Sequence, residues 1–117
     1  IKYINKSAHF IKNKLPDAKF YLWSNDLTNL KKEDLKFDFN VVDTSGYKNN
    51  FELRAFNLFL LSSCKHFIVT PSTFNWWGAW LSKNHNKIVT RPSKDFFSLF
   101  KVNNTDFWPN NWIKINE

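Results

Sequence analysis

One segment of the chain contains a complete strand–helix–strand unit: residues 66–90 read HFIVTPSTFNWWGAWLSKNHNKIVT. The β-branched run at residues 66–70 is typical of a strand, and a similar run occupies residues 87–90. Between them, Pro-Ser-Thr at residues 71–73 is a helix-capping sequence, and it predicts a helix over residues 74–82. Two strands joined by a helix at this spacing predict parallel strands with a right-handed crossover.

The segments before this unit continue the same alternation. Apolar residues at helical or strand-like spacing predict four more elements, namely helices over residues 3–14 and 51–64 and strands over residues 19–24 and 40–43. The helix over residues 51–64 is apolar on nearly every side, which predicts that it is well covered by the sheet. The tail from Ser93 is aromatic but irregular. The predicted fold is therefore α/β, with a mostly parallel sheet and flanking helices.

Composition limits the organisation of the chain. With 117 residues, 43% of them hydrophobic, the chain can bury one core, so we expect a single domain over residues 1–117. The chain contains no Met, so we expect it to be a fragment of a longer protein. Its longest apolar stretch is interrupted by polar residues and is too short to cross a bilayer.

Charge and cysteine content say less about function. The net charge of +7 suits a polyanion, an anionic membrane surface or a phosphorylated ligand, and it does not choose among them. The single cysteine, Cys64, has no partner for an internal disulfide and is predicted to be a small buried residue, which fits a reducing cytosol.

Polar residues follow each predicted strand. Because ligands bind at the carboxyl ends of the strands in open parallel sheets, we expect these residues to converge on one rim. They are Ser24, Asn25 and Asp26, then Asp43, Thr44 and Ser45, then Ser72 and Thr73, and finally Arg91.

The turn at residues 70–74 is the most specific of these candidates. It brings two hydroxyls and free backbone N–H groups to the start of a helix, an arrangement that binds phosphate. Taken alone, Ser72 or Thr73 is more often a plain helix cap, and Asp26 and Asp43 are more often turn-forming side chains. For Arg91, a contact with a phosphate and a surface ion pair are equally compatible with the sequence.

Other notable side chains favour structural roles. His66 begins a strand, and a structural hydrogen bond is its better interpretation. Three tryptophans, Trp76, Trp77 and Trp80, resemble a stacking surface for a base or sugar, but on a short helix beside a sheet they are predicted to be core residues. No His, Cys or acidic residues have the spacing of metal ligands, so no metal site is predicted.

Residues 72–81, Ser-Thr-Phe-Asn-Trp-Trp-Gly-Ala-Trp-Leu, look like the signature of the family 11 glycosyltransferases. In that family a helix ending in Ser-Cys-Lys-His precedes an apolar strand and this turn, and residues 63–66 read the same here. The resemblance extends to residues 16–26, whose strand ends in Ser-Asn-Asp, and to residues 86–89 and 112–115. It therefore covers essentially the whole chain.

This resemblance implies the carboxy-terminal, donor-binding part of a bacterial galactoside alpha-1,2-L-fucosyltransferase. The implied fold is a Rossmann-like half of the GT-B type, acting with an amino-terminal acceptor domain that this chain lacks. The implied reaction is inverting transfer from GDP-fucose to a galactose-containing glycan acceptor, without a metal or other cofactor, for surface glycan synthesis. The implied location is cytoplasmic, with peripheral contact at the inner membrane.

The resemblance also implies the donor-binding residues, which are Ser24, Asn25, Asp26, Asn57, Ser72, Thr73 and Phe74. Three positions depart from the family: Asn57 replaces an Asp thought to read guanine, Asn25 replaces the first acid of an acidic pair, and Pro71 replaces an Asn. The family's His-x-Arg-Arg-x-Asp motif, whose Arg offsets charge on the leaving diphosphate, is absent, so no catalytic residue is expected here and the chain alone is predicted to be inactive.

Two other functions compete with this interpretation. A noncatalytic sugar-binding or assembly domain would follow if the departures mark a decayed donor site. A nucleic-acid-binding module would fit the basic charge, but basic residues are scattered and no recognised fingerprint is present, so no nucleic acid is expected as a partner.

Overall fold

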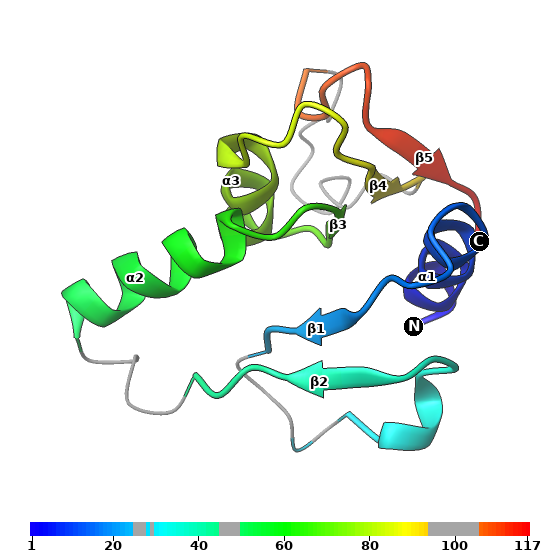
Figure 1. Cartoon of the computed structure of the whole chain (residues 1–117), viewed down its shortest axis with the longest axis horizontal. Coiled ribbons are helices and arrows are strands. Elements are labelled where there is room, and N and C mark those ends of the chain that lie inside the picture. Colours follow the sequence, from blue (N-terminus) through cyan, green and yellow to red (C-terminus); the bar gives the residue numbers. More distant parts are fainter. Residues whose placement is uncertain (25–27, 29, 45–49, 94–105) are drawn as a thin grey trace, which may run out of the picture.

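The computed structural model describes residues 1–24, 28, 30–44, 50–93 and 106–117. Helices and strands alternate along the chain (Figure 1), in the order α1 (Lys2–Lys14), β1 (Phe20–Leu22), the 3-10 turn η1 (Lys32–Asp34), β2 (Phe39–Val41), α2 (Phe51–Ser62), β3 (Phe67–Ile68), α3 (Thr73–Leu81), β4 (Val89–Pro92) and β5 (Ile113–Ile115). The elements predicted before residue 93 are all present, to within two residues at each end. None of the described helices is long and apolar enough to cross a bilayer.

All strand pairs among the described residues are parallel, which confirms the predicted α/β class. The strands are divided between two sheets: β1 pairs with β2, and β4 lies between β3 and β5. Between β1 and β3 lies a cavity of about 760 Å³, lined mainly by apolar side chains such as Phe20, Phe39 and Phe67. The arrangement is compatible with a Rossmann-like domain in which β1 and β3 are neighbours that do not pair.

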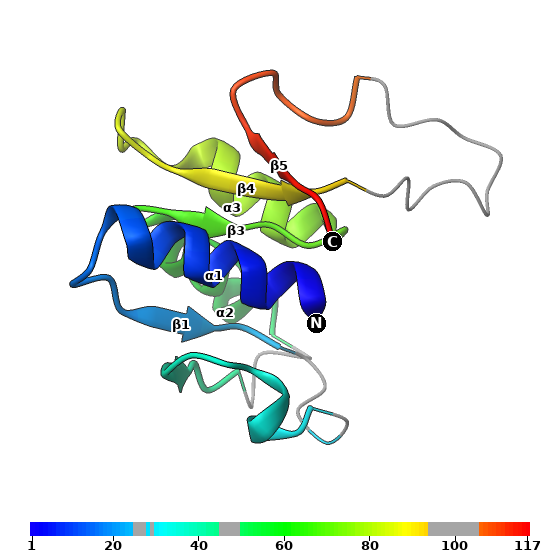
Figure 2. The same cartoon turned by 90° about the vertical axis from the view of Figure 1, so that its right-hand side faces the viewer.

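The helices cover both faces of the three-stranded sheet. Figures 1 and 2 show α1 on one face and the layer of α2 and α3 on the other. Tyr3 fixes α1 to the sheet, because its hydroxyl donates to the Val69 carbonyl oxygen at 2.8 Å and lies 3.2 Å from Thr90 Oγ1. Burial raises the pKa of Tyr3 to about 12. The three-stranded sheet is therefore covered by helices on both faces.

The carboxy-terminal segment differs from its prediction as an irregular tail. Ile113–Ile115 form β5, which pairs with β4. Trp108 and Trp112 are buried in the core with Leu61, Phe67, Val69, Ala79 and Val89. The Phe107 carbonyl oxygen accepts a hydrogen bond from Trp76 Nε1 at 2.7 Å. The sequence does not reveal this short strand because the strand packs against β4 and α1, which are distant in the sequence.

The prediction that α2 is well covered is wrong. Only Asn57 and Leu61 of this helix are buried, whereas Phe51, Phe56 and Phe59 are exposed. The reason is geometric: α2 packs mainly against α3, so a single side of the helix meets the rest of the molecule. Cys64, just after α2, is half-buried, and burial raises the pKa of its thiol.

Helix α3 is held at both ends and along one side. Its amino end is capped by Ser72, and its last carbonyl groups accept hydrogen bonds from Lys87 Nζ, at 2.7 Å for Ala79 and 3.1 Å for Ser82. Along its side, a Cβ placed on Gly78 would lie 2.5 Å from a Leu61 methyl carbon, so the glycine permits the close approach of α2. The segment that resembles the family signature is therefore held in place at both ends and along one side.

The tryptophans of α3 do not all behave as predicted. Trp76 packs against the core, as expected, and its ring stacks on Trp80 with centroids 5.3 Å apart. Trp77 and Trp80 are exposed, which contradicts their prediction as core residues. A helix that covers a sheet on one side buries only that side, and here the buried side is taken by Gly78 and Ala79.

Candidate functional site

The first part of the predicted rim lies where β1 and β2 end. Thr44 Oγ1 donates to the Ser24 carbonyl oxygen at 3.4 Å, so the segments that follow the two strands lie together. Asp43 is exposed at the end of β2. Asn25, Asp26 and Ser45 lie outside the described residues, and their predicted roles stay predictions.

The turn after β3 is closed by its own side chains. Ser72 Oγ accepts a hydrogen bond from the Asn75 backbone N–H at 3.1 Å, which confirms that Ser72 is the helix cap. The Ser72 backbone N–H donates to the Thr70 carbonyl oxygen at 2.7 Å, and Asn75 Nδ2 donates to Thr70 Oγ1. The sequence did not identify Asn75 as a site residue, because its role depends on the contact with Thr70, and an Asn within a helix does not reveal such a contact.

Two backbone donors remain at the amino end of α3. The N–H groups of Thr73 and Phe74, the first two residues of the helix, donate to no group in the described part of the chain. The Thr73 side chain is exposed, whereas the Phe74 ring packs partly against the core. Together with the positive end of the helix dipole, these groups form an arrangement that stabilises an oxyanion such as a phosphate.

Asn57 is connected to the first strand by a hydrogen bond. Its Oδ1 accepts from Trp23 Nε1 at 2.7 Å, and the residue is 8% exposed. This bond fixes the orientation of the amide, because only the oxygen can accept, and it leaves Nδ2 as the group that remains for a ligand. Trp23, Thr70 and Asn75 also line the cavity between β1 and β3. Trp23 was predicted only as a strand residue.

Arg91 belongs to β4 and is held against the carboxy-terminal segment. Its guanidinium carbon lies 5.8 Å from the centre of the Trp108 ring, and Nη1 donates to the Pro92 carbonyl oxygen at 3.2 Å. Its Nε is buried without a partner among the described residues. Cation–π contact with Trp108, which the sequence did not suggest, therefore positions this side chain.

His66 has the structural role that the sequence favoured. Its Nδ1 accepts a hydrogen bond from the Ile88 backbone N–H at 2.9 Å, which ties the start of β3 to β4. Burial, together with the nearby Lys65 charge, lowers the pKa of His66. Because Nδ1 accepts this hydrogen bond, it carries no proton, and the ring proton is on Nε2. Among the residues that the structure describes, no three His, Cys, Asp or Glu side chains are grouped as metal ligands.

The described part of the site thus consists of a capped helix start, two strand ends and one oriented amide.

A family model for glycosyl transferase family 11 matches residues 1–116. An alpha-1,2-colitosyltransferase of Escherichia coli is 27% identical over 114 residues, which cover 97% of this chain and 38% of that protein. The O-antigen biosynthesis glycosyltransferase WbnK of Escherichia coli is 45% identical over 60 residues, which cover 50% of this chain and 20% of that protein.

No solved structure matches the chain. The chain spans less than half the length of the two curated relatives. The family match, in contrast, runs from the first residue through α3 to β5, and so includes every element described above. On this evidence, the chain belongs to glycosyltransferase family 11.

Proposed function

We propose that the chain is the donor-binding part of an alpha-1,2-fucosyltransferase, which holds GDP-fucose for transfer to a galactoside in surface glycan synthesis. The observation that carries this proposal is that the backbone N–H groups of Thr73 and Phe74, in the turn region after β3, donate to no group among the described residues of this family 11 chain. A helix amino terminus at the carboxyl end of a parallel strand is a common place for a nucleotide phosphate.

The proposed chemistry needs negative charge to be stabilised. The bond between fucose C1 and the diphosphate oxygen breaks, and a bond from C1 to the acceptor hydroxyl oxygen forms with inversion. The hydroxyl proton passes to a base in another part of the protein. Negative charge grows on the leaving GDP. The amino end of α3, with the hydroxyls of Ser72 and Thr73, would stabilise that charge without a metal. The residue that activates the acceptor is proposed to belong to another part of the protein, so this chain alone is expected to be inactive.

Asn57 is proposed to contact the nucleotide base. Its oxygen is already used by Trp23, so the amide would offer a donor, Nδ2, to the base. An Asp at this position would keep a second oxygen free and would accept from the N–H groups of guanine. We therefore expect Asn57 to favour guanine less strongly than an Asp would.

The name of one relative favours a second donor sugar. The alpha-1,2-colitosyltransferase matches nearly the whole chain, so a colitosyl donor is the competing candidate at the same site. The N–H groups of α3 would contact the phosphates and not the sugar, so they serve either donor. Titration with both nucleotide sugars separates the two candidates through their relative affinities.

The proposal is tested by removing one backbone donor without removing the helix. Thr73→Pro replaces the first residue of α3, where proline is well tolerated, and Ser72 already has the extended conformation that must precede a proline (φ −146°, ψ 143°). Calorimetric titration should show GDP and GDP-fucose binding to the unmodified chain, no binding of UDP, and an affinity lowered about tenfold in Thr73→Pro.

The matched control is Phe51→Pro, the same change at the first residue of α2, which should leave GDP affinity unchanged. The double change Ser72→Ala/Thr73→Ala should also weaken binding, through the lost hydroxyls. Binding of GDP that is equally strong in Thr73→Pro would refute the phosphate site. A folded chain that binds none of these nucleotides would favour a sugar-binding or assembly role.

A further inference from the structure

Arg91 of β4 carries hydrogen-bond donors that the described part of the chain leaves unused. The residue is half-buried, and its Nε is fully buried without a partner there. Nη1 donates to the Pro92 carbonyl oxygen at 3.2 Å, and no acidic side chain within the described ranges forms an ion pair with the guanidinium. Because a buried cation without a partner is costly, this state of Arg91 points to an anionic ligand.

The Arg91 side chain lies on the α3 side of the sheet, at the carboxyl end of β4. Val89, two residues earlier and therefore on the same face, belongs to the core cluster together with Ala79 of α3. The Val69 backbone N–H donates to the Thr90 carbonyl oxygen at 3.0 Å, so the pairing of β3 with β4 continues to the point where the turn toward α3 begins. Arg91 is therefore next to the strand end that leads to the amino end of α3.

Arg91 is held in place and has a cationic neighbour. Its guanidinium carbon lies 5.8 Å from the centre of the ring of Trp108, a buried core residue. In β5, Lys114 is paired in register with Arg91, and residues paired in this way share a face of the sheet. Two positive charges so placed repel each other, and an anion between them relieves that repulsion.

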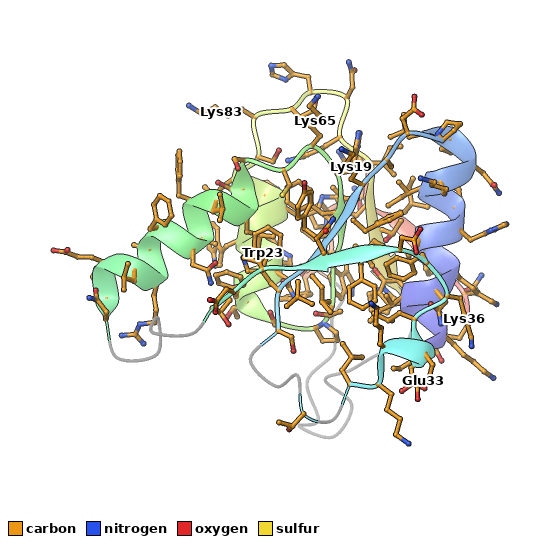
Figure 3. The ribbon with its side chains drawn as sticks, turned by 60° about the horizontal axis from the view of Figure 1, so that its bottom comes forward. Lys19, Trp23, Glu33, Lys36, Lys65 and Lys83 are labelled. Carbon is orange, nitrogen blue, oxygen red and sulfur yellow. The ribbon has the colours of Figure 1, made fainter. Side chains whose placement is uncertain are left out.

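Other lysines belong to the opposite end of the strands. In Figure 3, Lys19, Lys65 and Lys83 lie together toward one end of the molecule, and each of them precedes a parallel strand. Figure 2 shows the arrows of β1, β3 and β4 pointing in one direction. These three lysines are therefore at the amino ends of the strands, whereas Arg91 is at the carboxyl end of β4.

The groups of the proposed donor site follow one another along the strand ends. Asn57, proposed to contact the base, is bonded to Trp23 after β1, and the N–H groups at the start of α3 follow β3. The cavity lies between β1 and β3, and β4 is the neighbour of β3, with paired strands about 4.8 Å apart. A nucleotide with its base at Asn57 and its first phosphate at α3 therefore directs its next phosphate toward Arg91.

We infer that Arg91, with Lys114 beside it, binds the second phosphate of a nucleoside diphosphate, which is the phosphate that carries the sugar in the donor. The amino end of α3 binds the first phosphate through backbone dipoles, and Arg91 adds a full positive charge and the donors of a guanidinium, which suit phosphate oxygens. Arg91 has this role only if the donor is a nucleotide sugar, so the inference rests on the proposed function.

The test is calorimetric titration of the unmodified chain and of Arg91→Gln with GDP, GMP and inorganic pyrophosphate. Arg91→Gln should lower the affinity for GDP and for pyrophosphate roughly tenfold or more, because charge-assisted hydrogen bonds are lost, and the affinity for GMP by less than about threefold. The ratio of GDP to GMP affinity is the decisive readout, since impaired folding would lower both affinities equally.

Three further variants assign the contact. Arg54→Gln makes the same substitution at the exposed arginine of α2 and should leave all three affinities unchanged. Lys114→Gln should lower GDP affinity less than Arg91→Gln does, because Lys114 is exposed and its charge is screened by solvent. Thr73→Pro acts at the first phosphate, so it should lower the affinities for GDP and GMP alike.

The outcomes separate this inference from the proposed function. GDP binding that Arg91→Gln leaves unchanged would overturn the inference while the donor-binding function stands. An equal fall in GDP and GMP affinity would also overturn it, because Arg91 would then support the fold and not the second phosphate. Pyrophosphate binding that depends on Arg91, in a chain that does not bind GDP, would support the diphosphate contact and contradict the guanine nucleotide. A folded chain that binds none of the three ligands would overturn both.

Discussion

The two sheets of this domain differ in how they are stabilised. The β3–β4–β5 sheet lies between α1 and α3, and its strands carry buried side chains such as Phe67 and Val89. The β1–β2 sheet has half-buried or exposed side chains throughout, with Tyr21 53% exposed, and no strand pairing joins it to β3. A strand gains stability mainly from burial on its faces, so the β3–β4–β5 sheet forms the core and the β1–β2 sheet is attached to it.

The attachment rests on a few identifiable contacts. Trp23 Nε1 donates to Asn57, and Asn5 of α1 makes two hydrogen bonds with the segment before β2, to the Asp34 carbonyl oxygen at 2.9 Å and from the Lys36 backbone N–H at 2.7 Å. Regions with few buried contacts open at lower free energy than the core. The proposed donor site takes residues from both regions. We therefore expect the residues at α3 to be held by the core, and the position of the residues at β1 to depend on the hydrogen bonds of Trp23 and Asn5.

The largest expected effect comes from removing a core side chain of the stable region. Trp112→Ala should lower the free energy of unfolding by about 3 to 5 kcal/mol, because it removes a buried indole next to β5. Tyr21→Ala in the other sheet should lower it by less than about 1 kcal/mol, since that ring is half exposed. Urea unfolding followed by circular dichroism measures both values. Equal losses of unfolding free energy in Trp112→Ala and Tyr21→Ala would contradict the conclusion that the β3–β4–β5 sheet is the core and the β1–β2 sheet is attached to it.

The next effect concerns the contact between α2 and α3. Gly78→Ala should lower the free energy of unfolding by about 2 kcal/mol, because the added Cβ would overlap the Leu61 side chain. In a Leu61→Ala background the same change should be close to neutral, since the overlapping atoms are gone. The same unfolding assay, run on the four members of this double-mutant cycle, gives the coupling. Additive effects would show that the clash is relieved elsewhere.

A smaller effect is expected at the link between the two sheets. Trp23→Phe removes the donor to Asn57, so the free energy of unfolding should fall by about 1 kcal/mol, the usual contribution of one hydrogen bond. Hydrogen exchange should quicken at the amides of Phe20–Leu22 and Phe39–Val41 and stay unchanged at Val89–Pro92. Faster exchange throughout the chain would mean that the two sheets unfold as one unit.

The smallest expected effect is a pH dependence within the stable sheet. The pKa of His66 is lowered in the folded chain from an ordinary value of 6.5, so the unfolded chain binds the proton more readily. Stability from this group is therefore complete above pH 6.5 and is lost as the pH falls below it. His66→Asn, which keeps an acceptor for the Ile88 N–H but does not titrate, should reduce the pH dependence of the unfolding midpoint. An unchanged pH profile in His66→Asn would assign that dependence to other groups.

The features predicted well from sequence share a common property: their causes lie within a few residues. The order of elements up to β4 followed from local apolar patterns, and the cap at Ser72 followed from a short turn sequence. The role of His66 was also favoured correctly. At the proposed site, sequence named Ser72, Thr73, Phe74 and Asn57, but not Asn75 or Trp23, which act through bonds to residues on other elements.

By itself, the sequence determined the α/β class, the capped turn before α3 and the family, because each depends on which residues are adjacent in the chain. Only the tertiary structure decided which sides of α2 and α3 are covered, where β5 pairs, that the strands form two sheets and that Trp23 orients the Asn57 amide. The physical reason is that burial and long-range hydrogen bonds depend on what packs against a residue, and an apolar helix such as α2 has the same pattern whether a second layer covers it or not.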